Sequence, residues 1–429
     1  MLCPTDDSPA CPPPRGRCGE TYLRLSRFRV LLLCAVLLAP WVLIVSDSMS
    51  DHRPVGAAAR ANGPTASRTA STAQASSRGP WGELDFTSIR IAPPADFAAR
   101  FASLDTSAWY FRNYTPDTLA RFLKTTGATD AQRDAICRSC STDPQGPGLL
   151  ARPDAQLVGS LAASTRTAIY RALVDDPRNP QAEPFRHPAG VDWFADSGLS
   201  PAAADAARSL FYRRGNMEAF ADISALMPAI PNAGDRVQLF RTLAGQPALM
   251  LTLRVRPDSD LAALTRYWGR GGRERDVAPL LESLAKVPGG GSRVDVAQLL
   301  PPFARARLDT YPADPGPYLN GLYDCHWTSL NFWNDAPDVR LTDARFVSTR
   351  LRDDFHPIEA PTQLGDLVML TRPDGNAIHS AIFVAAGVVF TKNGSNVAAP
   401  WVLMKLDELL AYYDAGTPVR VLTFRRNDR

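Results

Sequence analysis

The sequence predicts an α+β protein with an N-terminal membrane segment, a mainly α-helical middle domain, and a C-terminal helix followed by an antiparallel sheet. Three observations carry this prediction. An uncharged run, VLLLCAVLLAPWVLIV, follows three arginines near the N-terminus. Helix start and stop signals then alternate through residues 84–310. In the last hundred residues, three β-rich stretches follow an aromatic helix.

Length and composition bound the class of protein. A chain of 429 residues with 45% hydrophobic composition is long enough for two or three domains with real cores. The formal net charge is +3, and the arginines are scattered among acidic residues instead of forming a basic stripe. This pattern argues against a nucleic-acid partner. Nothing in it predicts an oligomeric state.

The N-terminal part predicts attachment to a membrane. Residues 1–29 form a cytoplasmic tail and residues 30–46 a signal anchor or signal peptide, because positive charge before an apolar run stays inside. The run is short and contains Pro40, which keeps a cleaved signal open. The small-residue cleavage sites lie far from the apolar end, which favours a single-pass inner-membrane anchor with the body in the periplasm. If the signal is cleaved, the body is exported. Residues 47–83 are rich in Ala, Ser and Thr and predict a flexible linker.

Residues 84–310 predict a mainly helical domain of unknown role. The stretch TPDTLARFLKTTG has Thr115 as a helix N-cap, and TDAQ has the capping-box pattern from Thr129. Residues 248–255, ALMLTLRV, are a candidate strand. The arginine-rich stretch at 266–276 predicts a solvated loop, with an anionic glycan or phosphate site as the alternative.

The cysteine pattern singles out one thiol. Cys137 and Cys140 form a C-x-x-C without a second pair, which predicts a local disulfide in an oxidising compartment and no zinc site. Cys325 is then left over in an exported body. It is a packed thiol, half of a disulfide, a metal ligand or a nucleophile.

The stretch YDCHWTSLNFW favours the nucleophile. It places Asp324 at a helix N-cap and Cys325 at the first helical position. The positive end of the helix lowers the pKa of a thiol, and the same backbone N–H groups can donate to an oxyanion. The sequence therefore predicts a reactive thiolate at this position.

A histidine must accept the thiol proton, and elimination leaves His379. His326 points about 100° away from Cys325 around the helix. His52 lies in the linker, and His187 lies in a proline-flanked loop. His379 begins the strand HSAIFVA, whose rigid backbone can hold the ring against the helix start.

A hairpin count then suggests a third member of the site. A three-residue loop, AAG, would pair Val384 with Val388 and so set His379 opposite Asn393. Directly opposed side chains on one face lie about 5 Å apart, so the Asn393 amide could fix the imidazole tautomer. A two-residue turn would slip this register, and Thr391 is the substitute.

These motifs together resemble the NlpC-type family of cell-wall cysteine peptidases in the papain-like superfamily. YDCHW, QLGDLVML and IHSAIFVAAGVVFTKNG carry the resemblance, which covers about residues 315–425. It implies a papain-like cysteine hydrolase domain over residues 311–429. In that family's pattern Cys325 matches the nucleophile, His379 the base and Asn393 the polar orienter.

The resemblance also implies substrate-binding residues. Tyr318 resembles a tyrosine at the substrate groove, and Asp324 keeps the position that helps to bind the free amine of a wall peptide. His326 replaces the family's serine and is placed beside the groove. Gly365 and Asp366 match a Gly-Asp at a strand start, where the residues themselves predict a carboxylate that accepts backbone N–H bonds.

The function expected from these observations is an envelope thiol hydrolase that cleaves amide bonds in peptidoglycan stem peptides through a thioester. The expected partners are the wall peptide and the inner membrane, with no metal and no organic cofactor. Two alternatives stay open. One is a non-catalytic envelope scaffold built on the same module, and the other is an acyltransferase that uses the same residues.

Overall fold

The computed structural model describes residues 67–101, 108–312, 323–414 and 418–427, and it confirms an α+β fold containing antiparallel sheets. The apolar run at 30–46 and the first part of the expected linker lie outside these residues. None of the helices in the described ranges combines the length and the apolar character that crossing a bilayer requires.

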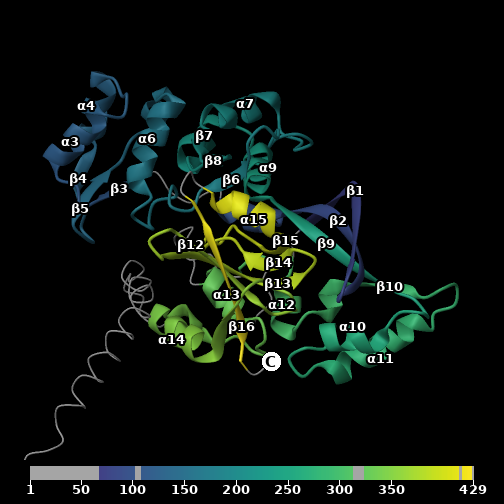
Figure 1. Ribbon diagram of the computed structural model, residues 1–429. Helices are drawn as coiled ribbons and strands as arrows, with labels where there is room; N and C mark the ends of the chain where they lie inside the picture. The colour runs from purple at the N-terminus through teal and green to yellow at the C-terminus, as the bar shows by residue number, and fades with distance from the viewer. Residues whose placement is uncertain (1–66, 102–107, 313–322, 415–417, 428–429) are drawn as a thin grey trace, which may run out of the picture.

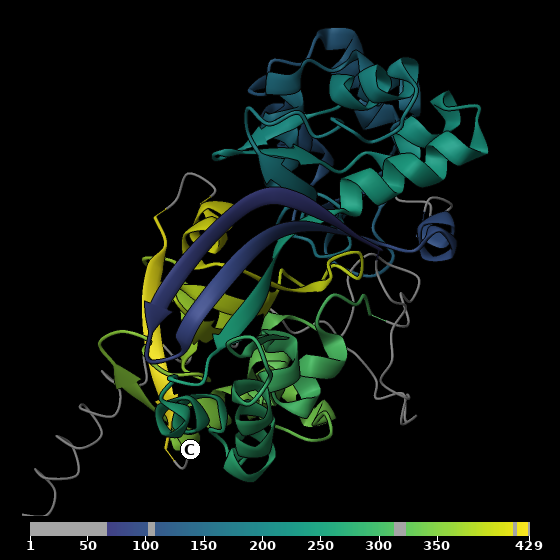
Figure 2. The same cartoon turned by 90° about the vertical axis from the view of Figure 1, so that its right-hand side faces the viewer.

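A long hairpin begins the described chain. Its strands β1 (Ser67–Gly79) and β2 (Gly82–Ala92) continue into a four-stranded sheet with β9 (Gln246–Val255) and β10 (Ser292–Asp295), in the order β1-β2-β9-β10. Figure 2 shows this hairpin as a curved ribbon along the molecule. The predicted linker at 47–83 is therefore wrong at its C-terminal end. Ladder bonds join backbone groups, so β1 needs few apolar side chains to pair with β2.

The middle region combines helices with two small sheets. The strands are β3 (Trp109–Arg112), β4 (Cys140–Thr142) and β5 (Gly148–Ala151) in the order β3-β5-β4, and β6 (Phe185–Pro188), β7 (Tyr212–Arg214) and β8 (Met217–Phe220) in the order β6-β8-β7. The helices are α2 (Ala95–Phe101), α3 (Pro116–Lys124), α4 (Asp130–Arg138), α5 (Ala155–Ser160), α6 (Ala163–Leu173), α7 (Pro201–Ser209), α8 (Ile223–Leu226), η2 (Met227–Ala229), α9 (Ala233–Ala244), α10 (Leu261–Trp268), α11 (Glu274–Ala285), η3 (Val296–Leu299) and α12 (Pro302–Arg307).

Local signals predicted some of these elements and missed others. Thr115 and Thr129 form the capping boxes that start α3 and α4, as expected. The candidate strand at 248–255 is β9. Strands β3 to β8 were not expected, because each is only three or four residues long and too short to show an alternating pattern. The middle region is therefore less exclusively helical than predicted.

The C-terminal part contains the aromatic helix and the largest sheet. Its helices are α13 (Cys325–Asn331), η4 (Val339–Thr342), α14 (Ala344–Asp354) and α15 (Leu406–Tyr413). Its strands, in the order β11-β16-β12-β13-β14-β15, are β11 (Phe355–Ile358), β12 (Leu367–Thr371), β13 (Ala377–Ala385), β14 (Val388–Lys392), β15 (Trp401–Lys405) and β16 (Arg420–Arg426). Figure 1 places this sheet at the centre of the molecule, with α15 beside β6 of the middle region.

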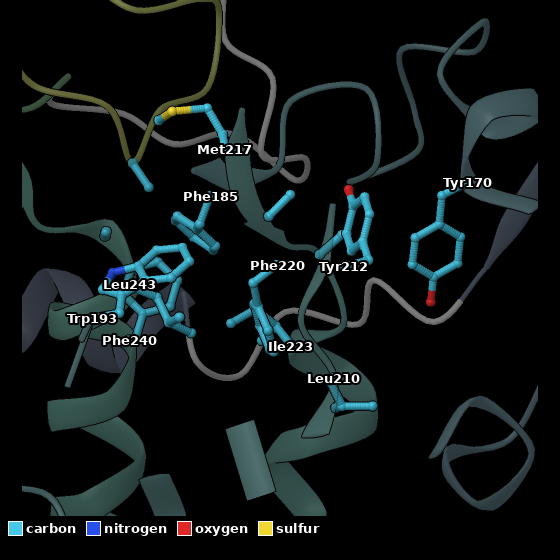
Figure 3. Packing of buried hydrophobic residues seen from close by; sticks show 14 of the residues in the cluster. Tyr170, Phe185, Trp193, Leu210, Tyr212, Met217, Phe220, Ile223, Phe240 and Leu243 are labelled. Carbon is cyan, nitrogen blue, oxygen red and sulfur yellow. The ribbon is translucent and has the colours of Figure 1, made fainter. Parts of the chain in front are cut away.

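Both faces of the central sheet are buried in cores shared with the middle region. On one face, Leu370 and Phe383 join a hydrophobic cluster that also contains Tyr412 and the middle-region core around Phe185 (Figure 3). On the other face, side chains such as Ile382 join a cluster with α10, α11 and α13. The predicted domain boundary at residue 311 therefore does not separate two cores.

Candidate functional site

The start of α13 has the predicted local structure. Asp324 is the N-cap, and its side chain accepts a 2.8 Å hydrogen bond from the Trp327 backbone N–H. The Asp324 carbonyl also accepts from the Thr328 hydroxyl at 2.8 Å. Cys325 is consequently fixed at the first helical position.

The thiol environment differs from the prediction of a reactive thiolate. Cys325 is only 5% exposed, and burial raises the pKa of its thiol well above the ordinary value. The Asp324 charge raises that pKa further, and a hydrogen bond from the Ser380 backbone N–H opposes the rise only in part. Loss of hydration outweighs the helix start because a thiolate is strongly stabilised by water. In this conformation Cys325 is a protonated thiol.

His379 is held in place, with one ring nitrogen left over. The residue is fully buried, its ring stacks on Tyr413 with centroids 4.3 Å apart, and its Nε2 lies 2.8 Å from the Thr391 hydroxyl. Within the described residues its Nδ1 has no hydrogen-bond partner. Burial holds the pKa of His379 well below its ordinary value, so the ring is neutral. Nδ1 can accept a proton in the tautomer in which Nε2 donates to the Thr391 hydroxyl.

The β13–β14 hairpin has the predicted register, but its turn differs from the predicted three-residue loop. Ala385 pairs with Val388 across a two-residue turn whose members, Ala386 and Gly387, both have positive φ. A bulge at Val384 then inserts one residue. The pairing of Ile382 with Phe390 is consequently the one that a three-residue loop would produce. The loop prediction was wrong, but the bulge compensates for the slip.

Thr391, not Asn393, contacts the histidine. Asn393 is buried, and its Nδ2 lies 3.6 Å from the sulfur of Met404. Among the described residues its Oδ1 has no hydrogen-bond partner. Thr391, the substitute considered from the sequence, therefore makes the histidine contact that was predicted for Asn393.

Cys325 and His379 both lie at the central sheet, but no hydrogen bond joins their side chains in the described structure. Helix α13 packs on one face of the central sheet, where the Ser380 hydroxyl donates to the Cys325 carbonyl at 3.3 Å. His379 stacks with Tyr413 in the core on the other face. Tyr413 is buried beside the His379 ring, and burial raises the pKa of its hydroxyl; the charge of a Cys325 thiolate would raise that pKa further. The ladder between β13 and β14 ends at the pairing of Ile382 with Phe390, before it reaches His379.

The structure gives the three predicted substrate-binding residues different settings. His326 is half-buried, and its Nδ1 lies 2.9 Å from the Ser380 hydroxyl, so its ring rests against β13. Asp324 is half-buried and serves as the N-cap. Tyr318 lies outside the described residues.

Asp366 has the structural role that was expected for it. One carboxylate oxygen accepts from the backbone N–H groups of Thr362 and Gln363 at 2.8 and 2.9 Å. Arg425 donates to both oxygens, each at 2.8 Å. Through these four bonds, the Asp366 carboxylate holds the start of β12 against β16.

Sequence reasoning missed a buried lysine that directly follows Thr391 in the chain. Lys392 is fully buried, and its Nζ donates to the backbone carbonyls of Gly394 and Asn396 at 2.9 and 2.8 Å. Burial lowers its pKa to about 8, and the charges of Glu183 and Asp324 oppose that shift. A lysine inside the otherwise uncharged run VVFTKNG was the available signal.

The C-x-x-C does not form the predicted disulfide. Cys137 and Cys140 are both free and half-buried, and the Cys140 thiol donates to the Ile136 carbonyl at 3.3 Å. Burial raises the pKa of Cys140 to about 11. The two thiols line a small cavity of about 270 Å³. The described part of the chain contains no group of three or more His, Cys, Asp and Glu side chains suited to a metal ion.

A wide cleft of the described structure is lined by residues other than Cys325. Its volume is about 1140 Å³, and it is lined by Arg266, Arg270, Asp335 and Asp338 among others. Residues 333–338 follow the C-terminal end of α13, whereas Cys325 begins that helix. The arginine-rich stretch at 266–276 spans the end of α10, a short connection and the start of α11, so only its middle is the predicted loop. It borders a cleft of mixed charge, whereas the Cys325 thiol is buried.

Comparisons with known protein families, with curated proteins and with solved structures give no match for this chain. The likeness of its motifs to the NlpC-type family stays a prediction from the sequence.

Proposed function

We propose that this chain is a thiol hydrolase that cleaves amide bonds of peptidoglycan stem peptides in the cell envelope. The Cys325 sulfur attacks the amide carbonyl carbon and forms a thioester, while His379 takes the thiol proton and returns it to the leaving amine. Water then cleaves the thioester and restores the thiol. Backbone N–H groups at the start of α13 stabilise the oxyanion.

One observation carries the proposal: the unpaired Nδ1 of His379. Leaving a buried polar atom without a partner costs on the order of 1–3 kcal/mol, and buried groups of this kind call for an explanation such as catalysis. Thr391 already holds the other ring nitrogen. An imidazole fixed in this way, beside a helix that begins with a cysteine, has the arrangement of a general base.

The choice of substrate and compartment rests on the sequence. The motif likeness supports a wall peptide, and the apolar run at 30–46 supports attachment to the inner membrane with the body in the periplasm. Asp324 and His326 flank Cys325 and are proposed to contact the peptide, together with Tyr318.

Digestion of purified wall tests this function. Incubation with the protein is expected to release soluble peptides, each cleavage creating one new amine and one new carboxylate. An acyltransferase would modify the wall without releasing peptides, and a scaffold would do neither. The absence of released peptides under conditions in which Cys325 is accessible would refute the hydrolase.

A non-catalytic scaffold is the second candidate, favoured by the burial of Cys325 and the raised pKa of its thiol. A raised pKa means that the thiolate forms only at a pH above the ordinary cysteine range. Alkylation of Cys325 measured against pH separates the candidates. A midpoint well below pH 8 indicates an activated thiol in an accessible conformation, whereas reaction only near pH 8.5 or above supports the scaffold.

Thr391→Val is expected to reduce the rate of peptide release by about tenfold or more, because valine keeps the shape but leaves His379 Nε2 unheld. Asn393→Ala, which removes the amide two positions further along, is expected to change the rate less. Initial rates and thermal midpoints of both variants check this. A larger loss in Asn393→Ala would restore Asn393 as the orienter.

A further inference from the structure

A segment of the middle region reaches the proposed thiol site from outside. Residues 181–186, here called the cover segment, connect the turn after α6 to strand β6. Within it, the Glu183 backbone carbonyl accepts a 2.9 Å hydrogen bond from the Asn396 amide. The Glu183 carboxylate lies against Gly394, where an added Cβ would stand 2.5 Å from its Oε2 atom. More than 200 residues of chain separate these partners, so the contact is purely tertiary.

Lys392 stabilises the 394–396 loop, which contacts the cover segment. Its Nζ binds the carbonyls of Gly394 and Asn396, the two residues that touch Glu183. Lys392 directly follows Thr391, whose hydroxyl lies 2.8 Å from His379 Nε2, so this loop begins beside the proposed base. The charge of Glu183 also raises the pKa values of Cys325 and Lys392. The contact between the cover segment and the 394–396 loop is therefore next to the site.

Arg186 fastens the other end of the cover segment to α15. Its guanidinium lies 4.7 Å from the centre of the Tyr412 ring and donates to the Tyr412 carbonyl at 3.4 Å. The neighbouring Tyr413 is the side chain that stacks on His379. The Arg186 side chain is nearly inaccessible, yet its Nε has no hydrogen-bond partner among the described residues.

The cover segment is anchored firmly on the middle region. Phe185 packs against Phe240 with ring centroids 5.6 Å apart (Figure 3). Arg214 donates to the carbonyls of Gln181 and Ala182 at 2.9 and 3.2 Å. On the other side, the bonds that join it to the thiol site come from Asn396 and Arg186. Opening of the site therefore requires these bonds to break and the apolar contacts between the cover segment and α15 to separate.

We propose that the cover segment is an autoinhibitory element that keeps Cys325 closed until a peptide substrate displaces it. The inference rests on the proposed function, because it assigns the regulation of the same site. Asn396 binds the Glu183 carbonyl as it would bind the carbonyl of an extended peptide. A substrate carbonyl takes over that amide when the cover segment leaves, and unpaired His379 Nδ1 and Asn393 Oδ1 become accessible together with the sulfur.

Alkylation of Cys325 tests the cover directly. Full-length protein is treated with iodoacetamide at pH 8, and the modification of each cysteine-containing peptide is followed by mass spectrometry. Asn396→Asp keeps the Oδ1 acceptor that caps Ala398 but removes the donor to Glu183. Asn396→Asp and Arg186→Met are each expected to label Cys325 about tenfold faster than wild type, the effect of one lost hydrogen bond on an opening equilibrium.

Asn216→Ala is the matched control. The exposed Asn216 amide also joins the middle region to the end of α15, through a 3.3 Å bond to Asp414, but it does not touch the cover segment. It is expected to leave the labelling of Cys325 unchanged. Cys137 and Cys140 report unfolding in the same samples, because unfolding exposes all three thiols together.

Two results would refute the autoinhibitory role of the cover segment. One is labelling of Cys325 at the wild-type rate in both variants, and the other is a rise shared equally with Cys137 and Cys140. If Cys325 alone is labelled faster but no peptide is released from wall, the autoinhibitory role of the cover segment is supported and the hydrolase function is refuted. If wild type digests wall but the variants label Cys325 at the wild-type rate, the hydrolase function is supported and the autoinhibitory role of the cover segment is refuted.

Discussion

Replacing Cys325 with alanine is expected to reduce peptide release from purified wall by at least about a thousandfold. Without the sulfur no thioester forms, and the remaining groups contribute little when the nucleophile is absent. The substitution removes a single buried atom, so the expected loss of stability is only about 1 kcal/mol. Release is measured by chromatography of soluble peptides, in the wild-type background and in the Asn396→Asp background.

Cys137→Ala is the control for this experiment. It removes another free, half-buried thiol that lies on α4 in a different part of the molecule. Its rate of peptide release should match that of wild type. If Cys325→Ala digests wall as fast as Cys137→Ala does, the catalytic assignment is wrong and the scaffold is the better description.

Asp366→Ala is expected to cost about 3–5 kcal/mol of the free energy of unfolding, the largest stability effect among these predictions. The carboxylate is nearly inaccessible and accepts from Arg425 and from two backbone N–H groups. Alanine leaves the guanidinium without its carboxylate and both N–H groups unpaired. The midpoint of urea unfolding measures the loss, with an unchanged slope showing that the folded state is the same kind of structure.

Asp374→Ala is the matched comparison, since this exposed turn carboxylate accepts a single bond from the Asn376 N–H. Its effect should be far smaller than that of Asp366→Ala. Equal effects in the two variants would mean that the network around Asp366 contributes no special stability. Loss of wall digestion in Asp366→Ala below its unfolding midpoint, with the fold intact, would instead assign Asp366 a part in the chemistry.

The sequence predicted the elements whose signals are local. Thr115, Thr129 and Asp324 each cap a helix by accepting a backbone N–H three residues ahead, so a few neighbouring residues contain the whole interaction. The β-rich stretches of the C-terminal sheet were recognisable for a similar reason, because strand residues and turn residues alternate along the chain. Short strands such as β7 lack such a pattern.

The register of the β13–β14 hairpin shows where local reasoning becomes ambiguous. A three-residue loop and a two-residue turn followed by a bulge at Val384 give the same pairing of Ile382 with Phe390. The sequence could not distinguish them, because Ala386 adopts a positive φ that alanine seldom takes. It also could not choose Thr391 over Asn393, since that choice depends on how Met404 packs against the amide.

By itself, the sequence determined that Cys325 begins a capped helix and that His379 lies near the start of a strand. The tertiary structure alone decided that the thiol is closed and protonated. Tyr413 and Glu183 reach the site from positions 88 and 142 residues away in the chain. The pKa of a thiol depends on how much water surrounds it, and contacts over such separations determine that hydration while leaving no pattern around Cys325 itself.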